Sequence, residues 1–315
     1  MQVRKIDESE WRDFVDNCPS ATFFHTPDWY KVWKDHFGWE IEARHFIFKS
    51  GSAALLPLCS RKRLKGFIKE YFSGPVGTYG GIITNTQLSK EEVILLERYL
   101  HNFNALQIRM NPFNSILEDT FFTEKDFTQT IALSQEWKSI LRSWSKSHSR
   151  SIKKGIREGV KISVASKNDW KHYYDIYQDS RKRWGEKASN NYSWDLFKIL
   201  SQLSPTVCKL WLAYKDEKII SGCLCFYCNQ HVVYWHGASL STHFHLKPAH
   251  VLQHHIIKHA AEEGYQWYDF NPSGGHEGVV NFKAGFGAEI ISSHLFINKS
   301  STIHHIENLK KRFTD

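Results

Sequence analysis

With 315 residues, 41% of them hydrophobic and 15% aromatic, the chain can bury two cores of ordinary domain size, which excludes an intrinsically disordered protein. No run of about 18 apolar residues is present, and the first twenty positions are rich in charge. We therefore expect a cytoplasmic protein with no membrane span. The formal net charge of +8 favours polyanionic partners, such as a pyrophosphate-bearing cofactor, a nucleotide-linked acceptor, tRNA or an anionic membrane surface.

The first half of the chain predicts a hairpin, a glycine-rich loop, a helix and a strand, in that order. A turn at Ser50-Gly51 joins the two apolar strands of the hairpin. The helix has one apolar face, formed by Val93, Leu96 and Leu100. In chain order, these segments are residues 43–49 and 53–58 (ARHFIFK and AALLPL), 74–81 (GPVGTYGG), 89–101 and 105–110 (ALQIRM).

The second half repeats this order, with one further strand. A turn at Asp216-Glu217 joins the strands of the second hairpin, and the helix begins at Pro248 and ends near Gly264. The segments are residues 209–215 and 218–227 (KLWLAYK and KIISGCLCFY), 231–239 (HVVYWHGAS), 240–247, 248–263 and 266–270 (QWYDF). Two copies of one order predict tandem α+β domains made by duplication.

A connecting segment, residues 136–159 (EWKSILRSWSKSHSRSIKKGIREG), separates the two halves. Its apolar periodicity ends near residue 146, which predicts domains at residues 1–145 and 146–315. The segment also carries a basic cluster with near-helical spacing, which could bind phosphates or could be an ordinary solvated helix face. The basic cluster consists of Arg150, Lys153, Lys154 and Arg157.

The loop at residues 240–247, which ends in Lys247, precedes the second-half helix. Backbone N–H groups and the positive end of the helix dipole at this point could hold a phosphate, and Lys247 would add a charge. The loop has no glycine-rich signature, so a plain strand-to-helix connection is an equal alternative.

Cysteine and histidine patterns do not predict a metal site. Cys223, Cys225 and Cys228 lie in an apolar run without a second CxxC pair, and we expect reduced cysteines. Four histidines on the second-half helix have i, i+4 spacing, but no HExxH sequence is present and a polar helix flank explains them. These are His250, His254, His255 and His259.

The segment from Tyr268 to Gly287, YDFNPSGGHEGVVNFKAGFG, is the strongest candidate for a functional site. Asp269 ends a strand, and a turn rich in proline and glycine follows, where Asn271 is a candidate binding residue. A short helix then presents Phe282, Lys283 and Phe286. Lys283 could neutralise a phosphate or an oxyanion, and Asp269 could orient or deprotonate an amine. In the alternative interpretation, the two phenylalanines belong to the core and Lys283 is exposed.

Several ordered landmarks resemble the Fem-type aminoacyltransferases, the methicillin-resistance-factor-like branch of the GNAT N-acyltransferase superfamily. They span nearly the whole chain: ATFFHTPDWYKVWKDHFG, LLPL, SGPVGTYGGIIT, SRSIKKGIREGVKI and YDF…EGVVNFKAGFG. The resemblance implies two tandem GNAT-like domains with mixed sheets and an interdomain cleft, and a last helix that packs on the first domain. It also implies that the Phe-Lys-x-x-Phe-Gly motif, here Phe282, Lys283, Phe286 and Gly287, lines the substrate cleft.

The sequence departs from this resemblance at two places. The glycine-containing pyrophosphate loop usual in the superfamily is absent between Ser239 and Pro248, which weakens the case for ordinary coenzyme A binding. The long heptad-rich hairpin of some members is also absent from residues 170–203. The chain is therefore similar to the shorter members, whose donors and acceptors vary.

These observations predict an N-acyltransferase that moves an acyl or aminoacyl group to an amine, with a role in cell-wall (peptidoglycan) or surface-polymer synthesis. As the resemblance suggests, a small-molecule or nucleotide-linked amine attacks the donor carbonyl directly. The donor is acyl-CoA, which the modest charge favours, or aminoacyl-tRNA. Expected catalytic residues are Lys283 for negative charge, Asp269 for the amine, and Tyr234 or His236 for proton transfer. The alternative is a non-catalytic protein that holds a glycan, peptide or nucleotide-sugar.

Overall fold

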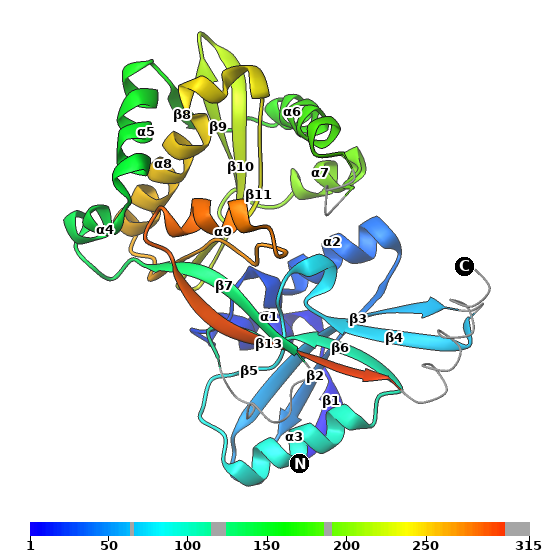
Figure 1. Cartoon of the computed structure of the whole chain (residues 1–315). Helices are drawn as coiled ribbons and strands as arrows, with labels where there is room; N and C mark the ends of the chain where they lie inside the picture. Colours follow the sequence, from blue (N-terminus) through cyan, green and yellow to red (C-terminus); the bar gives the residue numbers. More distant parts are fainter. Residues whose placement is uncertain (64–65, 115–123, 186–190, 300–315) are drawn as a thin grey trace. The chain divides into compact units, whose positions relative to one another are not determined.

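The computed structural model describes residues 1–63, 66–114, 124–185 and 191–299, and these form two compact units (Figure 1). Unit 1 holds Met1–Phe127 together with the described residues from Ile291 onward, and unit 2 holds Thr128–Ile290. Strands β7 (Glu124–Ala132) and β13 (Glu289–Lys299) each begin in one unit and end in the other. Residue 146 lies inside unit 2, and the domain boundary placed there remains a prediction. The expected last helix lies outside the described residues.

Unit 1 is a mixed sheet in the order β1-β2-β3-β4-β6-β13, with β5 paired to β3. Strands β4 and β6 are parallel, and α3 connects them, whereas the other pairs within this unit are antiparallel. The elements are β1 (Gln2–Lys5), α1 (Glu8–Asp16), α2 (Pro27–Phe37), β2 (Glu40–Ile47), β3 (Ala53–Arg63), β4 (Ile68–Ser73), β5 (Ile83–Thr84), α3 (Lys90–His101) and β6 (Ala105–Arg109). Short 3₁₀ turns lie at Phe23–His25 and Pro75–Gly77.

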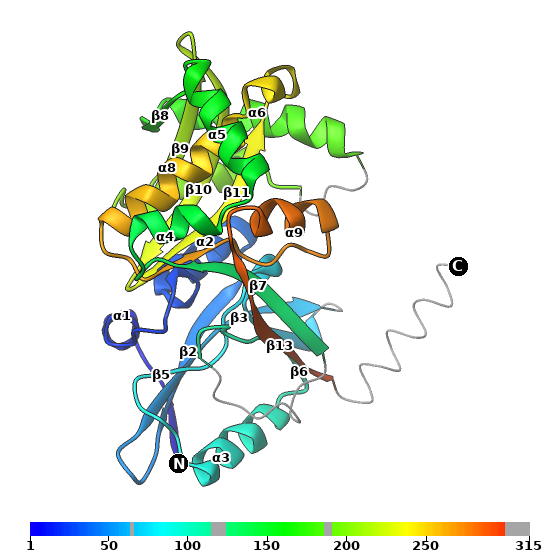
Figure 2. The same cartoon turned by 60° about the vertical axis from the view of Figure 1, so that its left-hand side comes forward.

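Local sequence signals fix the helices of unit 1. Asp7 and Thr26 cap α1 and α2 through their side-chain oxygens, and Ser89 forms a capping box with Glu92 at the start of α3. Helix α3 buries the predicted Leu96 and Leu100 in a core with apolar side chains of β2, β3 and β6. Figure 2 shows α3 on the opposite side of this sheet from α1 and α2.

Unit 2 repeats the same plan, with the strand order β7-β12-β11-β10-β9-β8. Here β11 and β12 are the parallel pair, and α8 connects them. The elements are α4 (Trp137–Ser143), α5 (Lys146–Arg157), β8 (Lys161–Val164), α6 (Asp169–Trp184), α7 (Trp194–Leu200), β9 (Cys208–Lys215), β10 (Lys218–Cys228), β11 (His231–Ser239), the 3₁₀ turn η6 (Ser241–Leu246), α8 (Pro248–Glu262), β12 (Trp267–Asp269) and α9 (Glu277–Ala284). The predicted α+β class with mixed parallel and antiparallel strand pairing is thereby confirmed.

Helices cover both faces of the unit 2 sheet, with α5 and α8 on one face and α6 and α7 on the other (Figure 1). The α5–α8 contact is close because Gly155 has no side chain: a Cβ there would lie 2.4 Å from Val251 Cγ2 and 2.7 Å from Leu246 O. One core contains Ile152 of α5, Val251 and Ile256 of α8 and the facing side chains of β9 and β10. This packing anchors the helices that carry the basic cluster and Lys247.

Candidate active site

A buried carboxylate organises the turn that follows β12. Asp269 is fully buried, and its Oδ1 accepts hydrogen bonds from Thr128 Oγ1 of β7 at 2.5 Å and from the backbone N–H of Asn271 at 2.9 Å. Asn271 has a left-handed backbone (φ 59°), which asparagine tolerates better than most residues. The carboxylate therefore fixes the path of the chain as it leaves the strand.

Lys283 of α9 reaches back into this turn. Its side chain is only 2% exposed, and its Nζ donates to Asn271 O at 2.5 Å and to Ser273 Oγ at 2.7 Å. An ammonium group has three N–H donors, so among the described residues one N–H of Lys283 has no protein acceptor. Predicted residues Asp269, Asn271 and Lys283 thus form one cluster, together with Ser273. We call this group the lysine cluster.

The protonation state of Lys283 reflects its burial. Desolvation lowers the pKa of its ammonium to about 8, while the Asp269 charge acts in the opposite direction. Lys283 therefore remains largely protonated at neutral pH but loses its proton more readily than an exposed lysine. The alternative interpretation of this segment expected an exposed Lys283, but the side chain is buried. That interpretation also expected Phe286 in the core, and Phe286 is fully buried in the core of unit 2.

The side chain of Asn271 has a polar atom without a hydrogen-bond partner among the described residues. This atom, Oδ1, is buried. A buried acceptor without a partner costs free energy, on the order of 1–3 kcal/mol. An amine or hydroxyl group of a substrate would supply the missing donor.

Helix α9 is held at its C-terminal end by α4 and α5. His148 Nε2 lies 2.9 Å from Phe282 O, and the backbone N–H of Ser145 donates to Gly285 O at 2.9 Å. A Cβ on Gly287 would lie 2.1 Å from Ser143 Oγ, and this glycine also has a positive φ of 71°. The last position of the Phe-Lys-x-x-Phe-Gly motif, Gly287, therefore requires glycine for two reasons: the close contact with Ser143 and the positive φ of its backbone.

Tyr234 and His236 lie on opposite faces of the sheet. Tyr234 pairs with Cys225 and packs against the core under α8, and its ring centroid is 6.1 Å from that of Phe270. His236 pairs with Leu224, because a bulge in β11 inserts Trp235 between the two. The two-residue period of the sequence does not predict this separation.

The environments of these two side chains also differ. Burial raises the pKa of the Tyr234 hydroxyl, so the hydroxyl stays protonated. The His236 ring lies among aromatic rings of the α6–α7 side, its Nδ1 is 2.6 Å from Tyr173 Oη, and burial lowers its pKa to about 3. His236 is therefore a neutral imidazole. No hydrogen bond among the described residues joins either side chain to Lys283.

The basic cluster lies on α5. Arg150, Lys153 and Arg157 are exposed and Lys154 is partly buried, and no acidic partner within the described residues forms an ion pair with them. Lys146 is a further exposed cation at the same helical spacing, four residues before Arg150. The opposite side of α5 packs on α8. The cations are therefore free to meet an anionic ligand.

The connection from β11 to α8 is a poor backbone cradle for a pyrophosphate. The N–H groups of His243 and Lys247 donate to Leu240 O and Phe244 O within the η6 turn, and Pro248 has no N–H. The residues present therefore do not form a glycine-rich phosphate loop. Positive charge at this place comes from side chains, Lys247 and the basic cluster.

Other candidates carry no comparable site. No group of three or more metal-ligating side chains occurs within the described ranges. Cys223 and Cys225 are buried in the core, and burial raises the pKa of both thiols. The described helices include none with the length and apolar character needed to cross a membrane.

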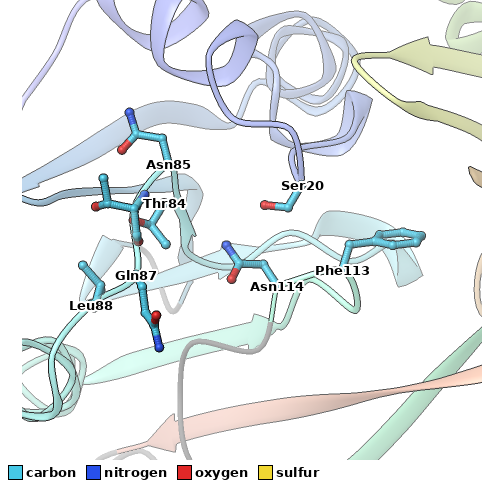
Figure 3. Close-up of a pocket in the computed structure, with 8 residues that line it drawn as sticks. Ser20, Thr84, Asn85, Gln87, Leu88, Phe113 and Asn114 are labelled. Atoms are coloured by element: carbon cyan, nitrogen blue, oxygen red, sulfur yellow. The ribbon is translucent and has the colours of Figure 1, made fainter. Parts of the chain in front are cut away.

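A separate depression of about 350 Å³ lies in unit 1 (Figure 3). Uncharged polar side chains dominate its lining, which comprises Ser20, Thr84, Asn85, Thr86, Gln87, Leu88, Phe113 and Asn114. In Figure 3 the Phe113 ring points away from the other labelled side chains. None of the catalytic or binding residues predicted from the sequence lines this depression.

Sequence reasoning does not identify Thr128, Ser273 or His148 as site residues. Thr128 belongs to the polar run TQT of β7, which the sequence does not mark as a strand, and its partner Asp269 is 141 positions away. His148 follows the helix-capping Ser145 by three residues. That spacing is a signal for the start of a helix, but it does not indicate contact with α9.

Unit 2 combines an otherwise antiparallel sheet with one parallel pair, β11 and β12, joined by the crossover helix α8. Residues 142–284 match a family model described as an acetyltransferase (GNAT) domain. No match was found among curated protein sequences.

Solved structures support the same fold. FemX covers 94% of this chain and 97% of its own, with a TM-score of 0.73 and 14% identity. The C-terminal domain of a putative lysylphosphatidylglycerol synthetase from Agrobacterium fabrum covers 94% of each chain, with a TM-score of 0.57 and 11% identity. A conserved protein of unknown function from Bacteroides thetaiotaomicron covers 95% of this chain and 100% of its own, with a TM-score of 0.55 and 10% identity. At these identities the likeness shows a shared fold.

Proposed function

We propose that this protein is an N-acyltransferase that uses the lysine cluster of unit 2 to move an acyl or aminoacyl group from an activated donor to an amine. The observation that carries the proposal is the buried Lys283 ammonium, whose third N–H has no acceptor among the described residues. A fixed, desolvated donor stabilises a developing oxyanion more strongly than a solvated one does, because water does not screen it. The matching GNAT domain model gives independent support.

In the proposed reaction, the neutral acceptor amine attacks the carbonyl carbon of the donor and a C–N bond forms. The carbonyl oxygen gains negative charge and accepts a hydrogen bond from the third N–H of Lys283, beyond the two that donate to Asn271 O and Ser273 Oγ. The C–S or C–O bond to the leaving group then breaks, and the amine proton passes to the departing sulfur or oxygen atom, which leaves as a thiol or an alcohol. No covalent intermediate with the protein is needed.

Asp269 supports Lys283 in this scheme. Its carboxylate is fully buried and already accepts two hydrogen bonds, so its main contribution is to shape the turn and to favour the charged lysine. Asn271 Oδ1 is the acceptor that we propose for the incoming amine. Phe282 and Phe286 hold the lysine helix against the core.

Proton transfer has two proposed candidates. The Tyr234 hydroxyl is protonated and lies beside Phe270, on the strand that pairs with β12. The His236 imidazole is neutral, as a proton acceptor must be, although its pKa of about 3 makes it a weak base. Because the two side chains lie on opposite faces of the sheet, they are alternatives for one site: Tyr234 suits donation of a proton to the leaving group, and His236 suits acceptance of a proton from the amine.

The donor that we favour is an acyl thioester such as acyl-CoA, with aminoacyl-tRNA as the second candidate. Basic side chains of α5 and Lys247 would bind the phosphates of either donor. The acceptor is a small-molecule or nucleotide-linked amine. The likeness to FemX, together with the Fem-type landmarks of the sequence, supports a role in cytoplasmic steps of cell-wall or surface-polymer synthesis.

Ligand-induced thermal shifts test this proposal. A ligand that binds only the native state raises the melting temperature, so coenzyme A, an aminoacyl-tRNA and a nucleotide-linked muropeptide are compared. Stabilisation by coenzyme A that persists in high salt supports the thioester donor, whereas salt-sensitive stabilisation by tRNA supports the second candidate. Acyl transfer to an amine is then assayed by mass spectrometry. If a glycan, peptide or nucleotide-sugar stabilises the protein and no transfer occurs with either donor, the protein is a binding protein and the proposal fails.

A further inference from the structure

His148 links α5 directly to the helix that carries Lys283. Its Nε2 is 2.9 Å from Phe282 O, the carbonyl oxygen immediately before Lys283. A carbonyl oxygen only accepts, so Nε2 carries the proton and donates. Nδ1 lies 3.0 Å from Ser145 Oγ, and this hydroxyl in turn accepts the backbone N–H of His148. Both ring nitrogens are thus used, and the imidazole has one defined orientation.

The face of the same ring is in contact with Gly285. A Cβ on Gly285 would lie 2.1–2.5 Å from three atoms of the imidazole, so only glycine fits there while His148 stays in place. The backbone at Gly285 is ordinary right-handed helix (φ −62°), so the need for glycine comes from His148 and not from the backbone. The His148 side chain therefore contacts the backbone on both sides of Lys283 and Ala284, at Phe282 and at Gly285.

Two other hydrogen bonds from outside the helix reach the α9 backbone: the backbone N–H of Ser145 donates to Gly285 O at 2.9 Å, and Gln129 Nε2 donates to Val280 O at 3.1 Å. The α9 residues Glu277, Gly278, Val279, Asn281 and Ala284 are exposed. The helix has only eight residues, and a helix of this length is not stable without tertiary contacts. The position of the Lys283 side chain therefore depends on how the last turn is held.

We infer that His148 is a positioning residue for Lys283: its N–H to Phe282 O and its contact with Gly285 hold the last turn of α9 so that the lysine N–H points at the reacting carbonyl. This inference rests on the proposed function for its catalytic part. His148 itself touches no reacting atom. It acts through the backbone of residues 282–285, and it connects the helix of the basic cluster to the lysine cluster.

Kinetics of two substitutions test the catalytic part. In His148→Ala the N–H donor is lost, and kcat falls about 10- to 100-fold while KM changes by less than about 3-fold, since a small misplacement of a catalytic group is costly. His148→Gln offers an amide N–H at a similar distance and restores kcat to within about 3-fold of the parent. His172→Ala, an exposed histidine of α6, is the matched control. Equal kcat in the parent and His148→Ala would overturn the inference.

A double-mutant cycle tests the structural part without any assay of activity. Gly285→Ala lowers the melting temperature of the parent by about 5 °C because the new methyl group meets the His148 ring, but it lowers that of His148→Ala by less than about 1 °C. Hydrogen exchange at Gly285, Phe286 and Gly287 rises in His148→Ala and returns to the parental rate in His148→Gln. Equal costs of Gly285→Ala in both backgrounds would refute the contact, whereas a coupled cycle without acyl transfer would refute only the proposed function.

Discussion

Lys283 donates a hydrogen bond to the backbone oxygen of Asn271 across a turn that Asp269 holds from its other side. The Lys283 ammonium, the turn and the Asp269 carboxylate are thus joined by hydrogen bonds, and the ammonium and the carboxylate carry opposite charges. The first prediction follows from the proposed role of the Lys283 ammonium as the hydrogen-bond donor to the oxyanion. Lys283→Met lowers turnover by at least about 100-fold, because the oxyanion loses its charged donor.

The fold of Lys283→Met is expected to remain. Methionine has a similar shape and needs no solvation, which offsets the loss of two hydrogen bonds to Asn271 O and Ser273 Oγ. The free energy of unfolding therefore changes by less than about 2 kcal/mol. Steady-state turnover and urea denaturation measure the two effects separately. An active Lys283→Met protein would remove Lys283 from the mechanism.

The second prediction concerns pH and stability. Burial lowers the pKa of Lys283 to about 8 from an ordinary value of 10.5. Between these two values the unfolded chain binds a proton that the folded chain has released, so this residue makes stability rise with pH across that window. Its destabilising effect, about 3 kcal/mol, is complete below pH 8. Urea denaturation of the parent and of Lys283→Met at pH 7 and pH 10 isolates the effect, and a difference that is the same at both pH values would contradict it.

The third prediction concerns Asn271. Asn271→Gly keeps the left-handed turn and removes the unpartnered Oδ1, so stability is unchanged or higher. Because the amine acceptor then loses its proposed hydrogen bond, its KM rises about 10-fold, which corresponds to a typical hydrogen bond. Asn271→Ala is the control for the backbone, and it lowers stability by about 1–2 kcal/mol through strain. A KM that is unaffected in Asn271→Gly would mean that the amine binds elsewhere.

The fourth prediction concerns the α5–α8 contact. Gly155→Ala places a methyl group against Val251 and the backbone oxygen of Leu246, and lowers the free energy of unfolding by about 1–3 kcal/mol. Gly278→Ala in α9 is the matched control, since a Cβ there meets nothing within 4 Å. The control is neutral or slightly stabilising. Thermal denaturation of the two variants side by side is sufficient, and equal melting temperatures would contradict the packing described.

The fifth prediction concerns the basic cluster. The variant has alanine at all four positions of the basic cluster, Arg150, Lys153, Lys154 and Arg157. It binds the phosphate-bearing donor more weakly, and its binding depends less on salt. The slope of log K against log salt concentration falls in magnitude by about 1 for each phosphate that is no longer neutralised. A control variant with Lys198→Ala and Lys258→Ala removes charge from other helices. Titrations at several salt concentrations distinguish the two variants. Identical slopes in both would place the donor elsewhere.

The sequence predicts those parts of the fold that are encoded locally. Helices α3 and α8 have continuous apolar faces and clear ends, and the two hairpins have apolar strands and turn residues, so periodicity is sufficient. Strand β4 is not predicted by periodicity, because its sequence IKEYFS contains charged residues. One of them, Glu70, is buried because it pairs with Arg61 and Arg63 of β3. Such pairing is a tertiary interaction, which the local sequence pattern does not predict.

The same distinction holds within the site. The strand end, the glycine turn and the resemblance to known proteins together predict the segment that contains Asp269 and Lys283. The burial of Lys283 is not predictable from the sequence, because its pocket depends on Asp269 and therefore on Thr128, which is distant along the chain. A lysine between phenylalanines is compatible with full exposure until the facing strand is known.

The bulge at Trp235 has a consequence for any attempt to redesign this protein. In a strand without a bulge, residues two positions apart face the same side, so Tyr234 and His236 would share one layer of helices. Because of the extra residue, the phenol of Tyr234 and the imidazole of His236 face opposite helix layers. This effect depends on the number of residues in the strand and not on which residue is inserted. Grafting β11 onto a regular scaffold would therefore have to carry the irregularity along, since copying the amino acids alone would bring both rings to the same face.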